Sequence, residues 1–237
     1  MSGSTDDGSQ PRVLVAGATG GTGGEIVDLL DRRGVTVRCL TRSSANRAAL
    51  RERGADEVVV GDLFDVDDAA RATEDVDVVL SAVGSTVVDR FRGDEFVDGV
   101  GNRNLLSGAV DAGAEAFVMV SALGVGDEPS SVLGSVFNLF IPPIQRAKAE
   151  AEAAIREAPI SHTIFRAGAL TGGSRSDDVH VARPGARLWG PVSRADVARV
   201  VVAAPWTPEA ADETFEVVRN PLVADRSLAI DWQMPGG

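Results

Sequence analysis

The chain has 237 residues, of which 44% are hydrophobic, and carries a formal net charge of −12. This length suits one α/β domain. Acidic residues are spread along the chain, and a nucleic-acid partner needs a basic face instead. No apolar run reaches the roughly 18 residues that span a membrane, so we expect no membrane partner and a cytoplasmic location.

Three further features of composition narrow the class of protein. Residues 1–10 are polar and acidic, and we expect a disordered tail there instead of a secretory signal. Cys39 is the single cysteine, so we expect a buried small hydrophobe and no internal disulfide. The 22 arginines beside one lysine resemble the composition of proteins from salt-loving organisms.

Short valine-rich runs alternate with stretches of helical spacing from residue 12 to residue 168. Runs without strict polar alternation are typical of strands that are buried on both faces. Strand–helix alternation of this kind predicts an α/β fold with a parallel sheet and right-handed crossovers. The predicted strands, with helices between them, are 12–17, 35–40, 57–62, 76–83, 116–122 and 161–168.

The alternation ends after residue 168. Residues 171–190 are polar and glycine-rich, a helix is predicted over 193–204 with Ser193 as N-cap, and residues 213–218 suit a last strand. This part is too short for an independent domain. We therefore expect residues 11–237 to form a single domain in which 169–192 and 205–237 make a small cap on the substrate side.

A glycine motif follows the first predicted strand and opens the first helix. Gly17, Gly20 and Gly23 have GxxGxxG spacing, in a context that calls for a sharp turn and close backbone approach to a diphosphate. The N–H groups and the positive dipole end of the next helix would face the phosphates. We expect cofactor contacts here, with a tight turn lacking a ligand as the alternative. The expected contact residues are Gly17, Ala18, Thr19, Gly20, Gly21, Thr22 and Gly23.

The second predicted strand leads into Thr41 and Arg42. An NAD site usually has a carboxylate here to hold the ribose hydroxyls. A guanidinium instead binds a 2′-phosphate, so Arg42 predicts NADP as the cofactor and disfavours NAD. Arg47, in the next helix, is a second candidate for this phosphate. A plain surface role for Arg42 is the alternative.

The third predicted strand leads into Asp62 and Leu63. Asp62 suits a hydrogen bond from the adenine amino group, and a turn or capping role is the alternative. Asp65 lies closer to the following helix and is the better N-cap candidate.

The ordered motifs of residues 12–204 resemble the NmrA-like, NAD(P)H-binding group of atypical short-chain dehydrogenases/reductases. They include "VLVAGATGGTGGEIV", "GDLFD", "VLSAVGS", "AKAEAEAAI", "SHTIFRAGALTGG" and "VSRADVARVVVAA". The resemblance implies a Rossmann-type doubly wound parallel sheet. It also implies cofactor contacts from the glycine loop, Arg42, Asp62, Leu63, Ala82, Val83, Gly84, Ser121, Lys148, Ala167 and Gly168. The family often has proline where this chain has Ala167.

The catalytic pattern of that family is incomplete in this chain. Catalytically standard relatives carry Tyr-x-x-x-Lys on one helix face, where Lys⁺ lowers the pKa of the tyrosine that moves the proton. Lys148 matches the lysine, but Ile144 stands at the tyrosine position and the chain contains no tyrosine. Three interpretations of Lys148 stay open: a surface lysine paired with Glu152, a ribose-binding lysine, or part of a working site with another acid.

Few other side chains suit proton transfer. Ser121 is expected at the carboxyl end of a strand, either bonded to a substrate carbonyl or capping a loop. His162 is expected to be structural or at the surface, and His180 to be a solvated loop residue unless it approaches the substrate. We expect no metal site, because the chain has no Cys/His cluster.

The sequence predicts an NADP-dependent oxidoreductase that passes hydride to a small acceptor without a tyrosine acid. Flavins, quinones or conjugated acceptors, which take their proton from solvent, suit such a site. Two alternatives are a non-catalytic NADP(H)-binding redox sensor or assembly factor, and a nucleotide-sugar epimerase/dehydratase-like enzyme. The sequence leaves the oligomeric state open, and an oligomer is compatible with it.

Overall fold

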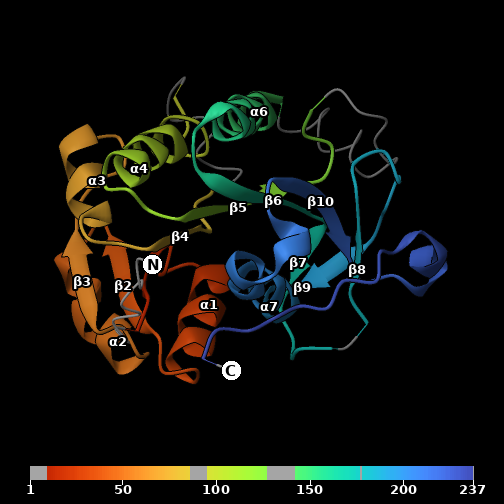
Figure 1. Ribbon diagram of the computed structural model, residues 1–237, viewed down its shortest axis with the longest axis horizontal. Coiled ribbons are helices and arrows are strands. Elements are labelled where there is room, and N and C mark those ends of the chain that lie inside the picture. The colour runs from red at the N-terminus through yellow and green to blue at the C-terminus, as the bar shows by residue number, and fades with distance from the viewer. Residues whose placement is uncertain (1–9, 86–94, 127–141, 177, 237) are drawn as a thin grey trace, which may run out of the picture.

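Eight strands of the described chain form a twisted sheet with helices on both faces in the computed structural model (Figure 1). The structure describes residues 10–85, 95–126, 142–176 and 178–236. Nearly all of the expected tail, residues 1–10, lies outside this part. So do residues 137–141 of the apolar run 137–143, for which the sequence favours a core position over a pocket lining or a subunit contact.

The strand order is β3-β2-β1-β4-β5-β6-β10-β8. All neighbours pair in parallel except β10 and β8, which are antiparallel. The order 3-2-1-4-5-6 is that of a Rossmann-type doubly wound sheet, so the predicted fold class is confirmed. The strands of this sheet are β1 (Arg12–Ala16), β2 (Thr36–Thr41), β3 (Glu57–Val60), β4 (Val78–Ser81), β5 (Ala116–Ala122), β6 (Ser161–Ala167), β8 (His180–Ala182) and β10 (Glu213–Val218).

The helices divide between the two faces of the sheet (Figure 1). One face carries α1 (Gly21–Asp31), α2 (Arg47–Glu52) and α7 (Arg194–Ala203). The other carries α3 (Val66–Thr73), α4 (Val100–Asp111) and α6 (Pro142–Glu157). Short 3₁₀ segments are η1 (Ser44–Asn46), η3 (Ala204–Trp206), η4 (Pro208–Ala210) and η5 (Pro221–Arg226).

Two apolar cores explain why the strands lack polar alternation. Val13 and Val15 of β1 join the core under α1 and α7, whereas Leu14 joins the core under α3 and α4. Successive side chains of a strand point to opposite faces, so a strand covered on both faces is apolar throughout. Cys39 of β2 is fully buried in the first core, and this burial raises the pKa of its thiol to about 12. The expected buried cysteine is confirmed.

The predicted helix starts rest on the expected caps. The Ser193 hydroxyl accepts a hydrogen bond from the Asp196 N–H at 3.0 Å, and Asp65 accepts from the Asp67 N–H at 2.9 Å. Both residues have extended backbone before a helix, as an N-cap requires. Among the described residues, no helix is both long and apolar enough to cross a membrane.

The carboxyl-terminal third is more closely joined to the sheet than the sequence suggests. A separate two-stranded sheet pairs β7 (Ala169–Thr171) with β9 (Pro191–Ser193). However, β10 lies inside the main sheet between β6 and β8, so the segment 205–237 is not a cap as a whole. Trp232 packs on Phe165 of β6, with ring centroids 5.9 Å apart. His180 lies in β8 with its side chain only 12% exposed, so the expected solvated loop histidine is wrong.

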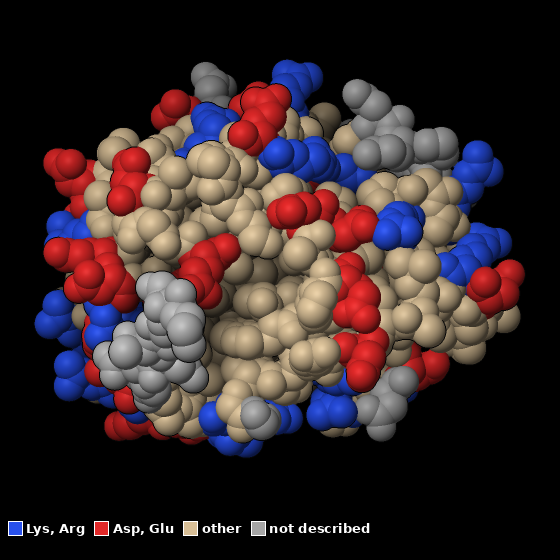
Figure 2. All heavy atoms as spheres, viewed as in Figure 1, with Lys and Arg blue, Asp and Glu red and all other residues tan. Residues whose placement is uncertain are grey.

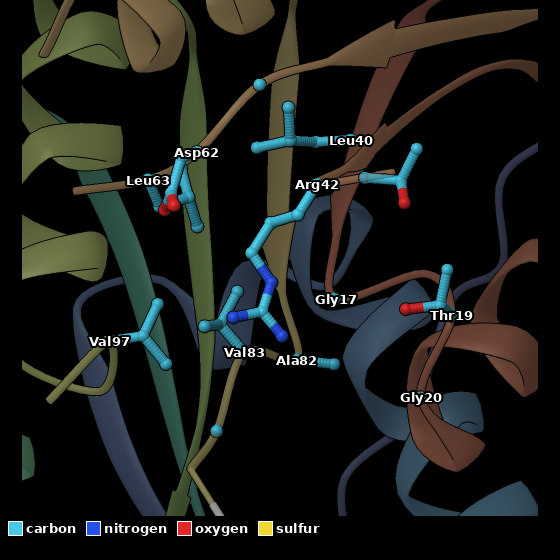
Figure 3. A pocket seen from close by; sticks show the side chains of 13 residues that line it. Gly17, Thr19, Gly20, Leu40, Arg42, Asp62, Leu63, Ala82, Val83 and Val97 are labelled. Carbon is cyan, nitrogen blue, oxygen red and sulfur yellow. The ribbon is translucent and has the colours of Figure 1, made fainter. Parts of the chain in front are cut away.

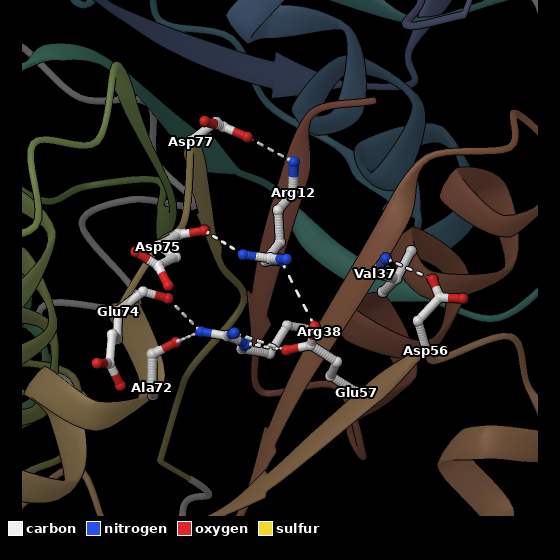
Figure 4. A network of polar contacts seen from close by, with 9 residues as sticks. All are labelled: Arg12, Val37, Arg38, Asp56, Glu57, Ala72, Glu74, Asp75 and Asp77. Carbon is white, nitrogen blue, oxygen red and sulfur yellow. Dashed lines mark hydrogen bonds and ion pairs between the residues drawn. The ribbon is translucent and has the colours of Figure 1, made fainter. Parts of the chain in front are cut away.

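A polar network joins the amino ends of β1 to β4, at the edge opposite their carboxyl ends (Figure 4). The Arg38 guanidinium donates to Glu57 at 2.6 Å and to the carbonyl oxygens of Ala72 and Glu74. The backbone N–H of Arg12 donates to Asp77 at 2.6 Å. These contacts fix the strand ends and leave the carboxyl edge for a ligand.

Charged side chains of both signs are interspersed around the rim of the face shown in Figure 2, and its centre is uncharged. This face therefore presents no continuous basic surface of the kind that binds nucleic acid.

Candidate functional site

A cavity of about 180 Å³ opens at the carboxyl ends of β1 to β4 (Figure 3). The strand order reverses between β1 and β4, and open α/β sheets bind ligands at such a switch point. The cavity is lined by Gly17, Thr19, Gly20, Leu40, Thr41, Arg42, Gly61, Asp62, Leu63, Ala82, Val83, Gly84 and Val97.

The glycine loop forms one wall of this cavity. Gly17 has a positive φ of 80°, and a Cβ there would lie 2.6 Å from the Ala82 carbonyl oxygen. A Cβ on Gly23 would overlap the carbonyl oxygen of Gly17. The turn closes with the Gly20 N–H donating to the Gly17 carbonyl at 2.9 Å. Tight packing therefore requires two of the three motif glycines, whatever binds beside them.

Helix α1 starts directly after this turn. Gly20 is its N-cap and supplies no side chain, and the first turn of the helix carries no acidic residue. The N–H groups of a first turn have no partner within the helix, and the helix dipole is positive there. This helix end is therefore suited to an anion such as a diphosphate.

The expected loop contacts divide into two sets. Gly17, Thr19 and Gly20 line the cavity. Ala18 is fully buried in the core and Thr22 is only 6% exposed, so neither offers its side chain to the cavity. Gly21 and Gly23 do not line the cavity either.

Arg42 is the central side chain of the cavity. It is exposed, extends from the end of β2, and points between Asp62 and Val83 (Figure 3). Within the described residues it forms no ion pair, which leaves its guanidinium open to an anion. Thr41 lies at the base, where its hydroxyl oxygen accepts from the Asn46 amide at 2.9 Å. Arg47 does not line the cavity, so the structure does not place the second candidate beside Arg42.

Asp62 and Leu63 form the wall opposite the glycine loop (Figure 3). Asp62 Oδ1 accepts from the Phe64 N–H at 3.1 Å, so the side chain also shapes its own turn. The Asp62 N–H donates to Asp68 Oδ2 at 2.7 Å, and this bond, with Arg71, holds the pKa of Asp68 below its ordinary value. The turn role and the ligand role of Asp62 are therefore compatible.

Ala82, Val83 and Gly84 cross the floor of the cavity after β4. The next residue, Ser85, donates its N–H to Asp98 Oδ2 at 2.7 Å. A carboxylate that precedes α4 thus fixes the end of this loop.

The same carboxylate holds Lys148. The Lys148 Nζ lies 2.6 Å from Asp98 Oδ1, the lysine side chain is 11% exposed and Asp98 is fully buried. The interpretation of Lys148 as a surface lysine paired with Glu152 is therefore wrong. Sequence reasoning missed Asp98. The available signal was Lys148 itself, because a buried ammonium needs a carboxylate partner.

Asp98 connects α6 to β4 through a chain of hydrogen bonds. Its carbonyl oxygen accepts from the Asn102 amide at 2.8 Å, and Asn102 Oδ1 accepts from the Ser81 hydroxyl at 2.6 Å. All these groups are buried. Because Asp98 offsets the positive charge of Lys148, the lysine is less able to lower the pKa of a neighbouring acid.

The tyrosine position of the family pattern is closed to proton chemistry in this chain. Ile144 lies one turn before Lys148 on α6 and is 2% exposed. It provides an apolar wall where relatives with the full pair provide a hydroxyl.

Ser121 belongs to a second buried network. Its hydroxyl donates to Glu152 Oε1 at 2.6 Å, and Glu152 also accepts from Arg166 at 2.7 Å and from Arg156 at 2.6 Å. Glu152 is fully buried. The Ser121 proton is thus directed at Glu152, not toward a substrate carbonyl. In this arrangement the Ser121 oxygen keeps its lone pairs as hydrogen-bond acceptors.

Ala167 and Gly168 are held by backbone contacts at the end of β6. The Leu123 N–H donates to the Ala167 carbonyl at 3.0 Å, and the Gly168 N–H donates to the Val217 carbonyl at 2.9 Å. A Cβ on Gly168 would overlap the Gly190 carbonyl oxygen. The turn is therefore constrained without the proline. Ser121, Lys148, Ala167 and Gly168 do not line the 180 Å³ cavity, although three of them lie at or just after the carboxyl ends of β5 and β6.

The histidines lie away from the cavity. His162 is 8% exposed near the start of β6. Its backbone N–H donates to Asp212 Oδ1 at 3.1 Å, in accord with a structural role. Within the described ranges, no group of three His, Cys, Asp or Glu side chains is placed to hold a metal ion.

The glycine loop, the switch-point cavity and Arg42, which has no ion-pair partner among the described residues, define a Rossmann-type dinucleotide-binding protein. A family profile described as NAD(P)H-binding matches residues 17–208, and the chain belongs to this family.

Known relatives differ in what they do. A sanguinarine reductase from Eschscholzia californica is 28% identical over 260 residues, covering 91% of this chain and 92% of that one. The photosystem II assembly factor Ycf39 from Synechocystis is 35% identical over 127 residues, covering 54% of this chain and 38% of that protein. A solved structure of a putative NAD-dependent epimerase/dehydratase from Bacillus halodurans has a TM-score of 0.75 at 26% identity, covering 91% and 97% of the two chains.

Proposed function

We propose that this protein is an NADP(H)-dependent oxidoreductase that passes hydride to a small acceptor and takes the accompanying proton from solvent. The observation that carries the proposal is the Arg42 guanidinium, which has no ion pair in the part of the chain that the structure describes. It points into the switch-point cavity where NAD sites usually hold a carboxylate (Figure 3). A carboxylate there would repel a 2′-phosphate, whereas a guanidinium binds one through two hydrogen bonds.

The residues present fit a dinucleotide. The first turn of α1 would hold the diphosphate, and the glycines leave room for close approach. Arg42 would hold the 2′-phosphate, Asp62 would accept from the adenine amino group, and Lys148 would bind the nicotinamide ribose. When bound, the nicotinamide supplies the hydride, and the protein supplies position and electrostatics.

The lack of a side-chain proton donor limits which hydride acceptors suit this site. The chain has no tyrosine, Ile144 fills the tyrosine position and Asp98 offsets the charge of Lys148. Ser121 directs its proton to Glu152. No group with an ordinary acid role thus remains among these positions, which favours acceptors such as flavins, quinones or conjugated systems. The same absence speaks against sugar epimerisation or dehydration, since both depend on a protein base.

The net charge of −12 supports a small-molecule partner instead of nucleic acid. A cytoplasmic location is part of the same proposal.

A second candidate is a non-catalytic NADP(H)-binding sensor or assembly factor. The pairing of Lys148 with Asp98 and the burial of Ile144 favour this candidate, because they allow a cofactor site without proton chemistry. The partial similarity to the assembly factor Ycf39 is in line with this candidate.

One experiment separates the two candidates. NADPH oxidation is followed with flavins, quinones and aldehydes in turn, beside a titration of NADPH binding to the same preparation. The oxidoreductase proposal expects turnover with a flavin, quinone or conjugated acceptor and little with simple aldehydes. Binding of NADPH without turnover on the whole panel would contradict the oxidoreductase and support the sensor.

A further inference from the structure

A second arginine lies at the start of α1, outside the cavity that holds Arg42. Arg194 is the first residue of α7, and its side chain crosses over Gly21, the first residue of α1. A Cβ on Gly21 would lie 2.5 Å from Arg194 Cδ, 2.7 Å from its Nε and 3.6 Å from its guanidinium carbon. Gly21, the third glycine of the loop, therefore makes room for an arginine.

Among the residues that the structure describes, no carboxylate pairs with this guanidinium. Arg194 is half-buried and, within the described residues, forms no ion pair or side-chain hydrogen bond. The first turn of α1 contains no acidic residue and carries the positive end of the helix dipole. The Arg194 guanidinium and the positive end of α1 repel each other unless an anion lies between or beside them.

The nearest carboxylate in the sequence is engaged elsewhere. Asp196 is fully buried, accepts from the Ser193 hydroxyl at 2.7 Å and accepts from the Ser176 N–H at 2.7 Å. These contacts direct Asp196 to the cap of α7 and the loop before β8, so it does not balance Arg194.

We propose that Arg194 is a binding residue for the diphosphate of the dinucleotide. The inference rests on the proposed function and adds a residue to the same site. A guanidinium binds phosphate oxygens through two parallel hydrogen bonds, and α7 packs along α1, so Arg194 is carried by a rigid element. Arg42 and Arg194 then bind different phosphates of one ligand, the 2′-phosphate and the diphosphate.

Because the two arginines would bind different phosphates, substitution of each should produce a different binding defect. The probes are NADPH, which has both phosphate positions, NADH, which has only the diphosphate, and adenosine 2′-monophosphate, which has only the 2′-phosphate. Arg194→Met should weaken NADPH and NADH by the same factor, about tenfold to about a hundredfold, and leave adenosine 2′-monophosphate unchanged. Arg42→Met should weaken NADPH and adenosine 2′-monophosphate and leave NADH unchanged.

Arg199→Met is the matched control. Arg199 lies on the same helix, is also half-buried and also lacks an ion pair within the described residues, but it lines a different surface cavity with Leu29 and Arg32. This variant should bind all three probes as the wild type does. Should Arg194→Met fail to fold, Arg194→Lys serves the same comparison, because lysine keeps the charge but loses the paired hydrogen bonds.

The outcomes distinguish the inference from the proposed function. Wild-type binding of NADPH with no change in the Arg194 variants overturns the inference alone. A uniform loss that includes adenosine 2′-monophosphate also overturns it, since Arg194 would then act on the fold. If the wild type binds neither dinucleotide, the proposed function is wrong and the inference with it.

Discussion

The pair of Lys148 and Asp98 is the clearest case in which single residues decide the chemistry. Both side chains are removed from water, and their charged atoms lie 2.6 Å apart. Breaking a buried pair from one side leaves an uncompensated charge, whereas removing both partners avoids that penalty. The pair therefore fixes the position of the lysine, which under the proposed function binds the ribose, and restrains its electrostatic effect on other groups.

Stability measurements test this description of the pair. Asp98→Asn and Lys148→Met should each lower the free energy of unfolding by about 3–5 kcal/mol, and the double variant should recover much of that loss. Chemical denaturation of the four proteins gives the coupling. Glu150→Gln is the control, because Glu150 is 56% exposed and its pair with Arg103 should contribute at most about 1 kcal/mol. Single variants as stable as this control would show that the pair is not buried.

The local sequence predicted the position of residues that lie directly at the end of a strand or the start of a helix. These residues are the glycine loop, Arg42, Asp62 and the caps at Asp65 and Ser193. Asp98 and Arg194 did not emerge, because their partners Lys148 and Gly21 are far away in the sequence. Such contacts depend on how helices pack across the sheet, which spacing along the chain does not record.

At the scale of elements, the apolar runs predicted strand positions closely. Residues 116–122 and 213–218 form β5 and β10 as expected, and the other predicted strands differ from the structure by one or two residues at one or both ends. The segment 169–193 was harder to predict. The three-residue strands β7, β8 and β9 have too few residues to show a period.

The amino ends and the carboxyl ends of the strands serve different roles, one in stability and the other at the cavity. Polar contacts of Arg12, Arg38 and Glu57 fix the amino ends of the strands (Figure 4). The carboxyl ends instead meet the glycine loop and the cavity. This separation allows ligand contacts to vary without loss of the network that joins β1 to β4.

For the whole molecule, the buried thiol of Cys39 links stability to alkaline pH. Its folded pKa of about 12 exceeds its ordinary value of 9.0 because burial disfavours the thiolate. Above roughly pH 9 the unfolded chain releases this proton while the folded chain keeps it, so stability falls as pH rises, by up to about 1.4 kcal/mol per pH unit. The contribution is fully present below pH 9.

A comparison of wild type with Cys39→Ala measures this effect. Free energies of unfolding from roughly pH 8 to roughly pH 10.5 should converge, because only the wild type loses stability through this thiol. Parallel curves over that range would show that Cys39 is exposed enough to ionise in the folded state.

The central claim is that this molecule binds NADP(H) through Arg42 and the glycine loop. The most direct measurement is a calorimetric titration of the full chain with NADPH and with NADH at one salt concentration. NADPH should bind more tightly than NADH by about tenfold to about a hundredfold, as expected for a guanidinium bound to a phosphate. Equal affinities, tighter binding of NADH, or binding of neither dinucleotide would contradict the central claim.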